Sequence, residues 1–577
     1  MQRVVPGSLR SFFSVVAVLA IAACSPGGRD NGDDDVDGGP PPGPDARPGD
    51  PDSGLPQNGP PYPDFPASPI LDTGVPANSS DLFSVDDTLG TGPCLAEPEV
   101  GTLFPNGWLR PRFTVAGSGS QNFFEIRISA DDELNPLVVY TTKTQWTMPS
   151  DIWAKMSLHL PGKPITVQVR GAVLSGNAIT SGPMLGTVGT VQIAPASATG
   201  TIVYWTTSDA SNLNGSALKA FDIGNESVHL VLQPKNAGLN EVQGCIGCHS
   251  TTPDGKYLAF ADATDPNITP GNRIDGRPGY IDLRSPIGDD ANAVTERPPA
   301  DVLSPTAITL LSRKNQHAPS FSGAHWETGD RYAVTMFQPN AGGVYTGKTD
   351  IIWTNLETLT DVQGMGWDVL QRIGDSNSAS AAAFSHDGTR VAYVSGSSVD
   401  SGVRDSFGKI FTVPWNNRLG GQVAEVTGAN DPAKNQSYPS WSADDRLIGF
   451  TRTDTTSSTP HSYDNRSAEI YVIPAEGGAA VRIRANDPPM CGGNPMSPGV
   501  TNSWAKWSPG PVTTVDGKTY YWLAFSSRRS PNHQPQIYVA PIVFGESGIE
   551  TYPALYLWNQ PANEGNHTPA WDNLQIQ

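Results

Sequence analysis

The chain has 577 residues and a formal net charge of -20 at pH 7, with 60 glycines, 53 prolines and only 16% charged residues. This length exceeds a single hydrophobic core, and the glycine and proline content favours strands and turns, so we expect at least two domains rich in β-structure. The acidic balance excludes nucleic acid as a partner and docking on anionic lipid by charge alone, because both require clustered lysine and arginine.

The N-terminus has the pattern of an export signal. Two arginines precede an apolar run over residues 12–20, which is too short to span a bilayer but suits the core of a signal peptide. The run leads into Ile-Ala-Ala-Cys24, which resembles the lipobox of bacterial lipoproteins, although an ordinary secretory signal with a chance cysteine is the alternative. The resemblance predicts a signal peptide over residues 1–23 and a lipid anchor on Cys24. Because Ser25 follows, it favours an outer-membrane lipoprotein of the cell envelope, facing the periplasm or the cell surface.

Residues 24–90 are poor in large apolar side chains and rich in proline, glycine and aspartate. Such a segment cannot bury enough apolar surface to offset the entropy lost when its backbone is ordered. We therefore expect a disordered tether between the anchor and the folded part.

Short alternating strands separated by turn residues follow over residues 91–197. Their spacing is typical of a sandwich of two sheets, and Trp146 and Trp153 have the size to fill the space between them. The general pattern resembles an immunoglobulin-like or fibronectin type III domain. The strand candidates are 109–115, 123–128, 137–140 and 165–170.

A sequence repeat runs through residues 198–577. Each copy has an aromatic residue, a tight turn and an apolar strand, as in WSADDRLIGF at 441–450 and FSHDGTRVAY at 384–393. In this pattern an Asp-Gly pair makes the turn and the aromatic packs between neighbouring sheets. Other copies, some with longer turns, begin near residues 251, 321, 507 and 571.

This repeat resembles the TolB-type β-propeller, whose blades follow the pattern W-S-x-D-G-x-x-I-A-F. The copy at 569–573 is cut short, and it needs the strands at 201–205 and 228–232 to complete its sheet. Joining these segments would close a ring and remove its open edges. We therefore predict an all-β fold in which the sandwich is followed by a six-bladed TolB-like β-propeller.

The segment Cys245-Ile-Gly-Cys248-His249 has the spacing that attaches a c-type haem through two thioethers, with the imidazole as an iron ligand. Alignment of the repeat copies puts His317 and His567 at the start of the innermost strands of the two neighbouring blades. We therefore expect three imidazoles and two thiols at one end of the propeller channel. These side chains could hold haem c, could bind zinc or another transition metal, or could include a structural disulfide.

Two further cysteines, Cys94 and Cys491, lie outside this motif. In an oxidising compartment two leftover cysteines tend to pair. We expect a possible disulfide between them, which would fasten the sandwich to the propeller.

The sequence contains no G-x-S-x-G elbow, phosphate-binding P-loop or zincin motif, so it offers little support for conventional catalysis. Two functions stay open. The first, preferred on architecture, is a lipid-anchored, non-enzymatic scaffold that binds a protein or a glycan of the cell envelope. The second is a redox protein that carries one covalent haem, or a transition-metal site, at the propeller channel.

Overall fold

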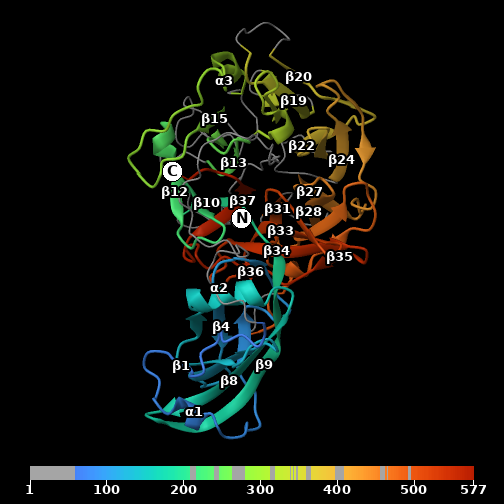
Figure 1. The fold of residues 1–577 in the computed structure, drawn as a ribbon. Coiled ribbons are helices and arrows are strands. Elements are labelled where there is room, and N and C mark those ends of the chain that lie inside the picture. The colour runs from blue at the N-terminus through green and yellow to red at the C-terminus, as the bar shows by residue number, and fades with distance from the viewer. Residues whose placement is uncertain are drawn as a thin grey trace, which may run out of the picture.

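The computed structural model of the protein consists mostly of strands, which make up 46% of it against 7% for helices (Figure 1). The all-β class predicted from the sequence is confirmed. The signal peptide, Cys24, Cys245 and His317 lie outside the residues that the structure describes. The described residues are 59–207, 216–239, 246–262, 280–311, 319–337, 340–341, 344–345, 348–358, 366–396, 408–454, 462–463, 465–491 and 496–576.

The N-terminal part contains two sheets, with the strand orders β1-β6-β5-β8-β9-β3 and β2-β4-β7. Apolar side chains alternate along the strands: in β4, Phe113 and Val115 are buried and the residues between them are partly exposed. The strands are β1 (Ile70–Leu71), β2 (Cys94–Glu97), β3 (Leu103–Asn106), β4 (Arg112–Ala116), β5 (Phe123–Ser129), β6 (Leu137–Thr141), β7 (Gln145–Thr147), β8 (Pro164–Ser175) and β9 (Ala178–Ser197).

Trp153 reaches the core of this part from a helix. It lies on α2 (Ser150–His159), and its indole nitrogen donates a hydrogen bond to the carbonyl oxygen of Trp108 at 2.7 Å. Trp153 and Trp146 belong to the same apolar cluster, although only Trp146 lies on a strand. Within the described ranges, no helix has the length and apolar character that a membrane crossing requires.

Residues 59–90 belong to the folded structure, which corrects the expectation of a disordered tether as far as residue 90. β1 pairs with β6 in parallel, and α1 (Ser79–Leu82) is followed by Phe83. The side chains of Phe65 and Phe83 are only 1% and 3% exposed. Burial of a few well-spaced aromatic side chains thus offsets the entropy lost when the backbone of the segment is ordered. The average composition does not reveal this effect.

Six sheets of three or more strands follow one another along the described part of residues 201–572, and Figure 1 shows them arranged around a common centre. Here we call this arrangement the ring. The sheets have the orders β12-β11-β10-β37, β13-β14-β15, β16-β19-β20, β22-β23-β24-β26, β27-β28-β29-β30 and β31-β33-β34-β35.

The bounds of these strands are β10 (Thr201–Thr207), β11 (Ala217–Asp222), β12 (His229–Leu232), β13 (Cys248–Thr251), β14 (Leu258–Asp262), β15 (Tyr280–Arg284), β16 (Tyr332–Phe337), β19 (Asp350–Asn355), β20 (Trp367–Val369), β22 (Ser378–Phe384), β23 (Arg390–Gly396), β24 (Lys409–Pro414), β26 (Ala424–Glu425), β27 (Lys434–Trp441), β28 (Leu447–Asp454), β29 (Glu469–Pro474), β30 (Val481–Arg482), β31 (Ser503–Trp507), β33 (Lys518–Ser527), β34 (Gln536–Gly545), β35 (Gly548–Thr551) and β37 (Gly565–Asp572). Shorter elements connect or extend them: η1 (Pro234–Ala237), α3 (Pro305–Leu311), η2 (Gly323–His325), β17 (Asn340–Ala341), β18 (Val344–Tyr345), β21 (Gln371–Ile373), β25 (Gly420–Gln422), η3 (Arg484–Asn486), β32 (Thr513–Val515) and β36 (Leu555–Tyr556).

The first and last strands of the ring share one sheet. β37 pairs with β10 in antiparallel orientation, so that Trp205 lies opposite His567 and Ile202 lies opposite Trp571. Thr201 adds a side-chain hydrogen bond of 3.0 Å to the carbonyl oxygen of Leu574. The pairing leaves neither β10 nor β37 as an open edge on this side.

Four strands of the ring, each at one end of its sheet, share a backbone irregularity. In β22, β27, β31 and β37 the ladder with the next strand shifts register just before the aromatic residue of the repeat. A β-bulge inserts one extra residue at such a place and re-aims its side chain. The residue three positions before the aromatic has a positive φ in each case: Ala381 (49°), Tyr438 (53°), Trp504 (68°) and Thr568 (39°).

One apolar core runs through the junction between the N-terminal part and the ring. Trp571 of β37 belongs to the same cluster as Trp108, with ring centroids 6.4 Å apart. Three indole nitrogens donate to backbone carbonyl oxygens across or beside this junction: Trp522 to Ser197, Trp558 to Arg110 and Trp571 to Thr199, at 3.2, 2.9 and 2.9 Å.

Candidate functional site

The structure describes the predicted haem motif in part. Cys248 and His249 are the first two residues of β13, and the side chain of Cys248 lies outside the described part of the chain, as do Cys245 and His317. Geometry can therefore be given for two of the predicted ligands, His249 and His567.

His249 is buried, with 5% of its surface exposed. Its Nδ1 lies 3.0 Å from the carbonyl oxygen of Gly247, and its Nε2 lies 3.3 Å from the carbonyl oxygen of Val203 in β10. Burial lowers the pKa of the imidazole. Both ring nitrogens thus face backbone acceptors.

His567 is on β37, directly opposite Trp205 of β10, and is 1% exposed. The two rings have centroids 5.0 Å apart, and the hydroxyl of Tyr463 lies 2.7 Å from Nδ1. Burial lowers the pKa of His567 to about 3. The structure therefore places His249 and His567 against the same strand, β10, both as neutral buried rings.

Haem ligation by His249 stays a prediction, because a neutral imidazole has one N–H and can donate to only one of the two carbonyl oxygens, that of Gly247 or that of Val203. Gly247 packs so closely on Trp205 that an added Cβ would lie 2.6 Å from the indole. Among the described residues, no group of three or more histidine, cysteine, aspartate and glutamate side chains has the arrangement to hold a metal. Haem or metal binding through Cys245 and Cys248 stays a prediction.

A pocket with a volume of about 510 Å³ lies at the junction between the N-terminal part and the ring. Its wall combines carboxylate, guanidinium and aromatic side chains. Those from the N-terminal part are Glu97, Glu99, Arg112, Thr114 and Gln145, and those from the ring include Arg529, Asn532, Tyr538, Tyr556 and Trp558.

Glu97 is the last residue of β2 and is 19% exposed. Arg112 and Thr114 of the neighbouring strand β4 donate to its Oε2, each at 2.9 Å. Burial raises the pKa of Glu97, and Arg112 opposes this rise. All three hydrogen bonds to this carboxylate, including a second one from Arg112 at 3.2 Å, go to one oxygen.

Glu99 lies two residues further along, with 13% of its side chain exposed. Its carboxylate pairs with Arg484, which belongs to the ring. Burial raises the pKa of Glu99, Arg484 opposes the rise, and the nearby carboxylate of Asp487 adds to it. The pocket thus contains two glutamates whose pKa values are both raised, and such perturbed acids gather at functional sites.

Aromatic rings back the charged groups. The guanidinium of Arg112 lies 5.3 Å from the ring centroid of Tyr556, and that of Arg529 lies 4.6 Å from that of Tyr538. Trp558 is half-buried, with its indole nitrogen bonded to a backbone carbonyl oxygen. Flat half-buried rings beside hydrogen-bonding groups can bind a ligand that has an apolar face and a polar edge.

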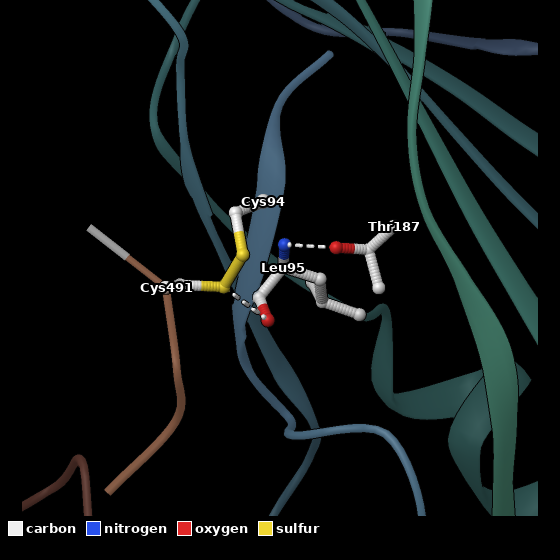
Figure 2. Close-up of a disulfide and its surroundings, with 4 residues drawn as sticks. All are labelled: Cys94, Leu95, Thr187 and Cys491. Carbon is white, nitrogen blue, oxygen red and sulfur yellow. Dashed lines mark hydrogen bonds between the residues drawn. A yellow bond between two sulfur atoms is a disulfide. The ribbon is translucent and has the colours of Figure 1, made fainter. Parts of the chain in front are cut away.

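A disulfide joins the two walls of the pocket. Cys94 of β2 and Cys491 have Cα atoms 5.6 Å apart and form the disulfide predicted from the sequence (Figure 2). Next to it, the backbone nitrogen of Leu95 donates to the hydroxyl of Thr187 at 2.9 Å (Figure 2). The disulfide lies a few residues from Glu97 on one side and from Pro489 on the other, and both of these line the pocket.

Sequence reasoning missed Glu97, Glu99 and Arg529, because they form no recognisable motif. The usable signal was the pairing of Cys94 with Cys491: a bond between these cysteines brings together the segments beside them, and with them the residues of the pocket.

No family model matches the chain, and no curated protein does. Solved structures similar to it include an endo-arabinase from Bacteroides thetaiotaomicron VPI-5482, with 14% identity over 41% of this chain and 78% of that chain and a TM-score of 0.24. An α-L-arabinofuranosidase from Lactobacillus brevis has 10% identity over 53% of this chain and 94% of that chain, with a TM-score of 0.27. A prolyl endopeptidase structure has 12% identity over 62% of this chain and 47% of that chain, with a TM-score of 0.29.

These comparisons correct the function predicted from the sequence. The chain was expected to be a non-enzymatic binding scaffold, whereas the similar solved structures are enzymes, so that prediction is wrong by this comparison and we do not retain it. At TM-scores below 0.3 the likeness assigns no reaction to this chain. Any activity has to be argued from the pocket itself.

Proposed function

We propose that the protein is a hydrolase that cleaves glycosidic bonds in the pocket at the junction between the N-terminal part and the ring. One observation carries the proposal: two glutamates, Glu97 and Glu99, line the same pocket and both have a raised pKa. Most glycoside hydrolases use a pair of carboxyl groups, one protonated and one ionised, on either side of the bond to be broken.

We assign the role of base to Glu97. Arg112 and Thr114 hold its Oε2, which orients the carboxylate and leaves Oε1 to accept a proton from water. Glu99 is the acid, because burial raises its pKa despite the opposing charges of Arg484 and Arg529. In the step, water attacks the anomeric carbon and gives its proton to Glu97, while Glu99 donates its proton to the departing glycosidic oxygen. Exchange with solvent then restores both groups.

The aromatic wall would position the sugar. The apolar face of a pyranose ring can pack on Tyr556 or Trp558, and the amide groups of Gln145 and Asn532 can bond its hydroxyls. These are the features of a site that fixes orientation with few polar groups among flat apolar surfaces.

We further propose that the ring is a six-bladed TolB-like β-propeller and that the N-terminal part is an immunoglobulin-like or fibronectin III-like sandwich. The order of the six sheets, the pairing of β10 with β37 and the repeated bulge support the first, and the two stacked sheets of the N-terminal part support the second. The lipobox-like sequence at Cys24 supports a lipid-anchored location in the cell envelope, where extracellular glycans are accessible.

The test is hydrolysis by the full chain on a panel of p-nitrophenyl glycosides and polysaccharides. We expect Glu97→Gln and Glu99→Gln each to lower the rate on the cleaved substrate by about a hundredfold or more, the usual scale for removal of a general acid or base. The pH profile of the wild type should be bell-shaped with its optimum above 4.5, since both pKa values are raised from that value.

The matched control is Glu226→Gln. Glu226 also pairs with an arginine, Arg110, but it does not line the pocket, so its loss should leave the rate unchanged. The proposal fails if the wild type releases no product from any member of the panel, or if both pocket variants keep the wild-type rate.

A further inference from the structure

Arg529 presents a buried cation to the pocket. Its surface is only 6% exposed, the residue lines the pocket, and its guanidinium lies 4.6 Å from the ring centroid of Tyr538, which also lines the pocket. Burial lowers the pKa of Arg529 to about 10, so the group still carries its charge at neutral pH. A charge removed from water in this way requires compensation from its surroundings.

The partners of Arg529 among the described residues are all neutral. Nε donates to the hydroxyl of Ser527 at 3.1 Å, and Nη2 donates to the carbonyl oxygen of Ala485 and to the side-chain oxygen of Asn502, each at 2.7 Å. A longer bond of 3.3 Å runs from Nη2 to the carbonyl oxygen of Asn486. These bonds fix the plane of the guanidinium through Nε and Nη2, and the remaining donor group is Nη1.

The two other arginines at this junction differ from Arg529. Arg112 pairs with Glu97, and Arg484 pairs with Glu99. Among the described residues, no carboxylate forms an ion pair with Arg529. Glu99 and Asp487 act on it only at longer range, and both already pair with Arg484.

We propose that the pocket binds a sugar that carries a carboxylate, which accepts a hydrogen bond from Nη1 of Arg529. This inference rests on the proposed glycosidase function and names its substrate class: glycans that contain hexuronic acid. A planar guanidinium whose other donors are already fixed is well suited to a carboxylate, because charge-assisted hydrogen bonds are short and directional. A neutral sugar would leave the buried cation without a counter-charge.

The test compares sugars that differ only in the carboxylate. Binding of the methyl 1-thio-β-glucuronide, galacturonide and mannuronide, which resist hydrolysis, is measured by calorimetry against the matching methyl thiohexosides. The wild-type chain is used, so that Arg112 keeps its partner Glu97. We expect at least one acid to bind about tenfold or more tightly than its neutral counterpart, as loss of one charged hydrogen bond predicts. The preference should weaken as salt is raised.

Arg529→Lys and Arg529→Gln test the residue. The lysine variant keeps the charge and should retain part of the preference, whereas the glutamine variant should remove it. Arg528→Gln is the control, because Arg528 is the preceding arginine in the chain and does not line the pocket. If the glutamine variant does not fold, the comparison of acidic with neutral sugars in the protein that retains Arg529 still shows whether the pocket prefers a carboxylate.

The outcomes separate the two proposals. If no acid binds more tightly than its neutral partner, the inference is overturned, and cleavage of a neutral glycoside by the wild type would leave the glycosidase function standing. The other outcome is that an acidic sugar binds more tightly than its neutral counterpart, with this preference lost in Arg529→Gln, while the wild type cleaves no glycoside. In that case the carboxylate site is supported and the glycosidase function fails.

Discussion

Lys506 places an amino group in the interior of the ring. Its side chain is 3% exposed, and Nζ lies 4.7 Å from the ring centroid of Trp504. Nζ forms no hydrogen bond with any described residue. Burial lowers the pKa of Lys506 well below 10.5, and only Asp572 opposes this. The residues at the same place in the other sheets are small: Ser250, Ser320, Ala383, Ser440 and Ala570.

We predict that Lys506→Met stabilises the protein. Removal of an unsatisfied buried amine should raise the free energy of unfolding at pH 7 by about 1–3 kcal/mol. Between the lowered pKa of the folded chain and 10.5, the unfolded chain binds a proton at this lysine that the folded chain has lost, so this lysine makes the stability of the wild type rise with pH across that window. Lys506→Met should remove that part of the rise, as measured by urea unfolding between pH 6 and 10.

Lys518→Met is the control for this prediction. Lys518 is 48% exposed on β33, so its replacement should leave both the stability and its pH dependence nearly unchanged. A Lys506→Met protein that is less stable than the wild type, or that keeps the full pH dependence, would show that the amine has a stabilising partner.

At the scale of elements, the disulfide between β2 and the loop that holds Cys491 keeps two walls of the pocket together. β2 carries both Cys94 and Glu97, and the loop supplies Pro488 and Pro489 to the opposite wall. The sulfur of Cys491 also lies 3.2 Å from the carbonyl oxygen of Leu95 in β2. The disulfide therefore constrains the separation of the two walls as well as the unfolded chain.

We predict that the double variant Cys94→Ser, Cys491→Ser lowers the free energy of unfolding by about 2–4 kcal/mol, the usual range for a native disulfide. Thermal unfolding would measure the loss, and the wild type treated with reductant should lose a similar amount. If the variant binds pocket ligands as tightly as the wild type, the disulfide serves stability alone. If it unfolds at the wild-type temperature, the bond does not contribute in solution.

At the scale of the whole molecule, the pairing of β10 with β37 joins segments from the two ends of the ring, and it does so beside the N-terminal part. Trp571 of β37 contacts both β10 and the N-terminal part. It lies opposite Ile202 of β10, its indole nitrogen donates to the carbonyl oxygen of Thr199, and its indole packs near Trp108. Trp571 is therefore one of the side chains through which the stability of the ring is coupled to that of the N-terminal part.

We predict that Trp571→Ala costs about 3–5 kcal/mol of stability, because it deletes a large buried ring from the shared core. Unfolding of both parts should shift together, as followed by tryptophan fluorescence and by proteolysis of each part. Trp571→Phe fills most of the volume and should lose much less. Separate transitions in Trp571→Ala, with only the ring destabilised, would contradict the coupling.

The sequence by itself determined the class of fold and the position of its repeated unit. Turn residues and apolar alternation are local properties, so the aromatic at Trp441 or Phe384 marked the start of a repeat before any contact was known. The pairing of the last strand with the first could also be anticipated, because an incomplete sheet needs a partner strand. Cys94 and Cys491 were paired by elimination in the same way.

Tertiary structure alone brought together the residues of the proposed site. The haem motif led to His249, whose ring nitrogens face backbone carbonyls, whereas Glu97, Glu99 and Arg529 share a pocket that no sequence pattern indicated. Residues 59–90 proved to be folded through a few aromatic contacts, although their composition predicted disorder. The physical reason is common to these cases: burial, charge pairing and pKa shifts depend on neighbours in space, and segments distant in sequence supply those neighbours.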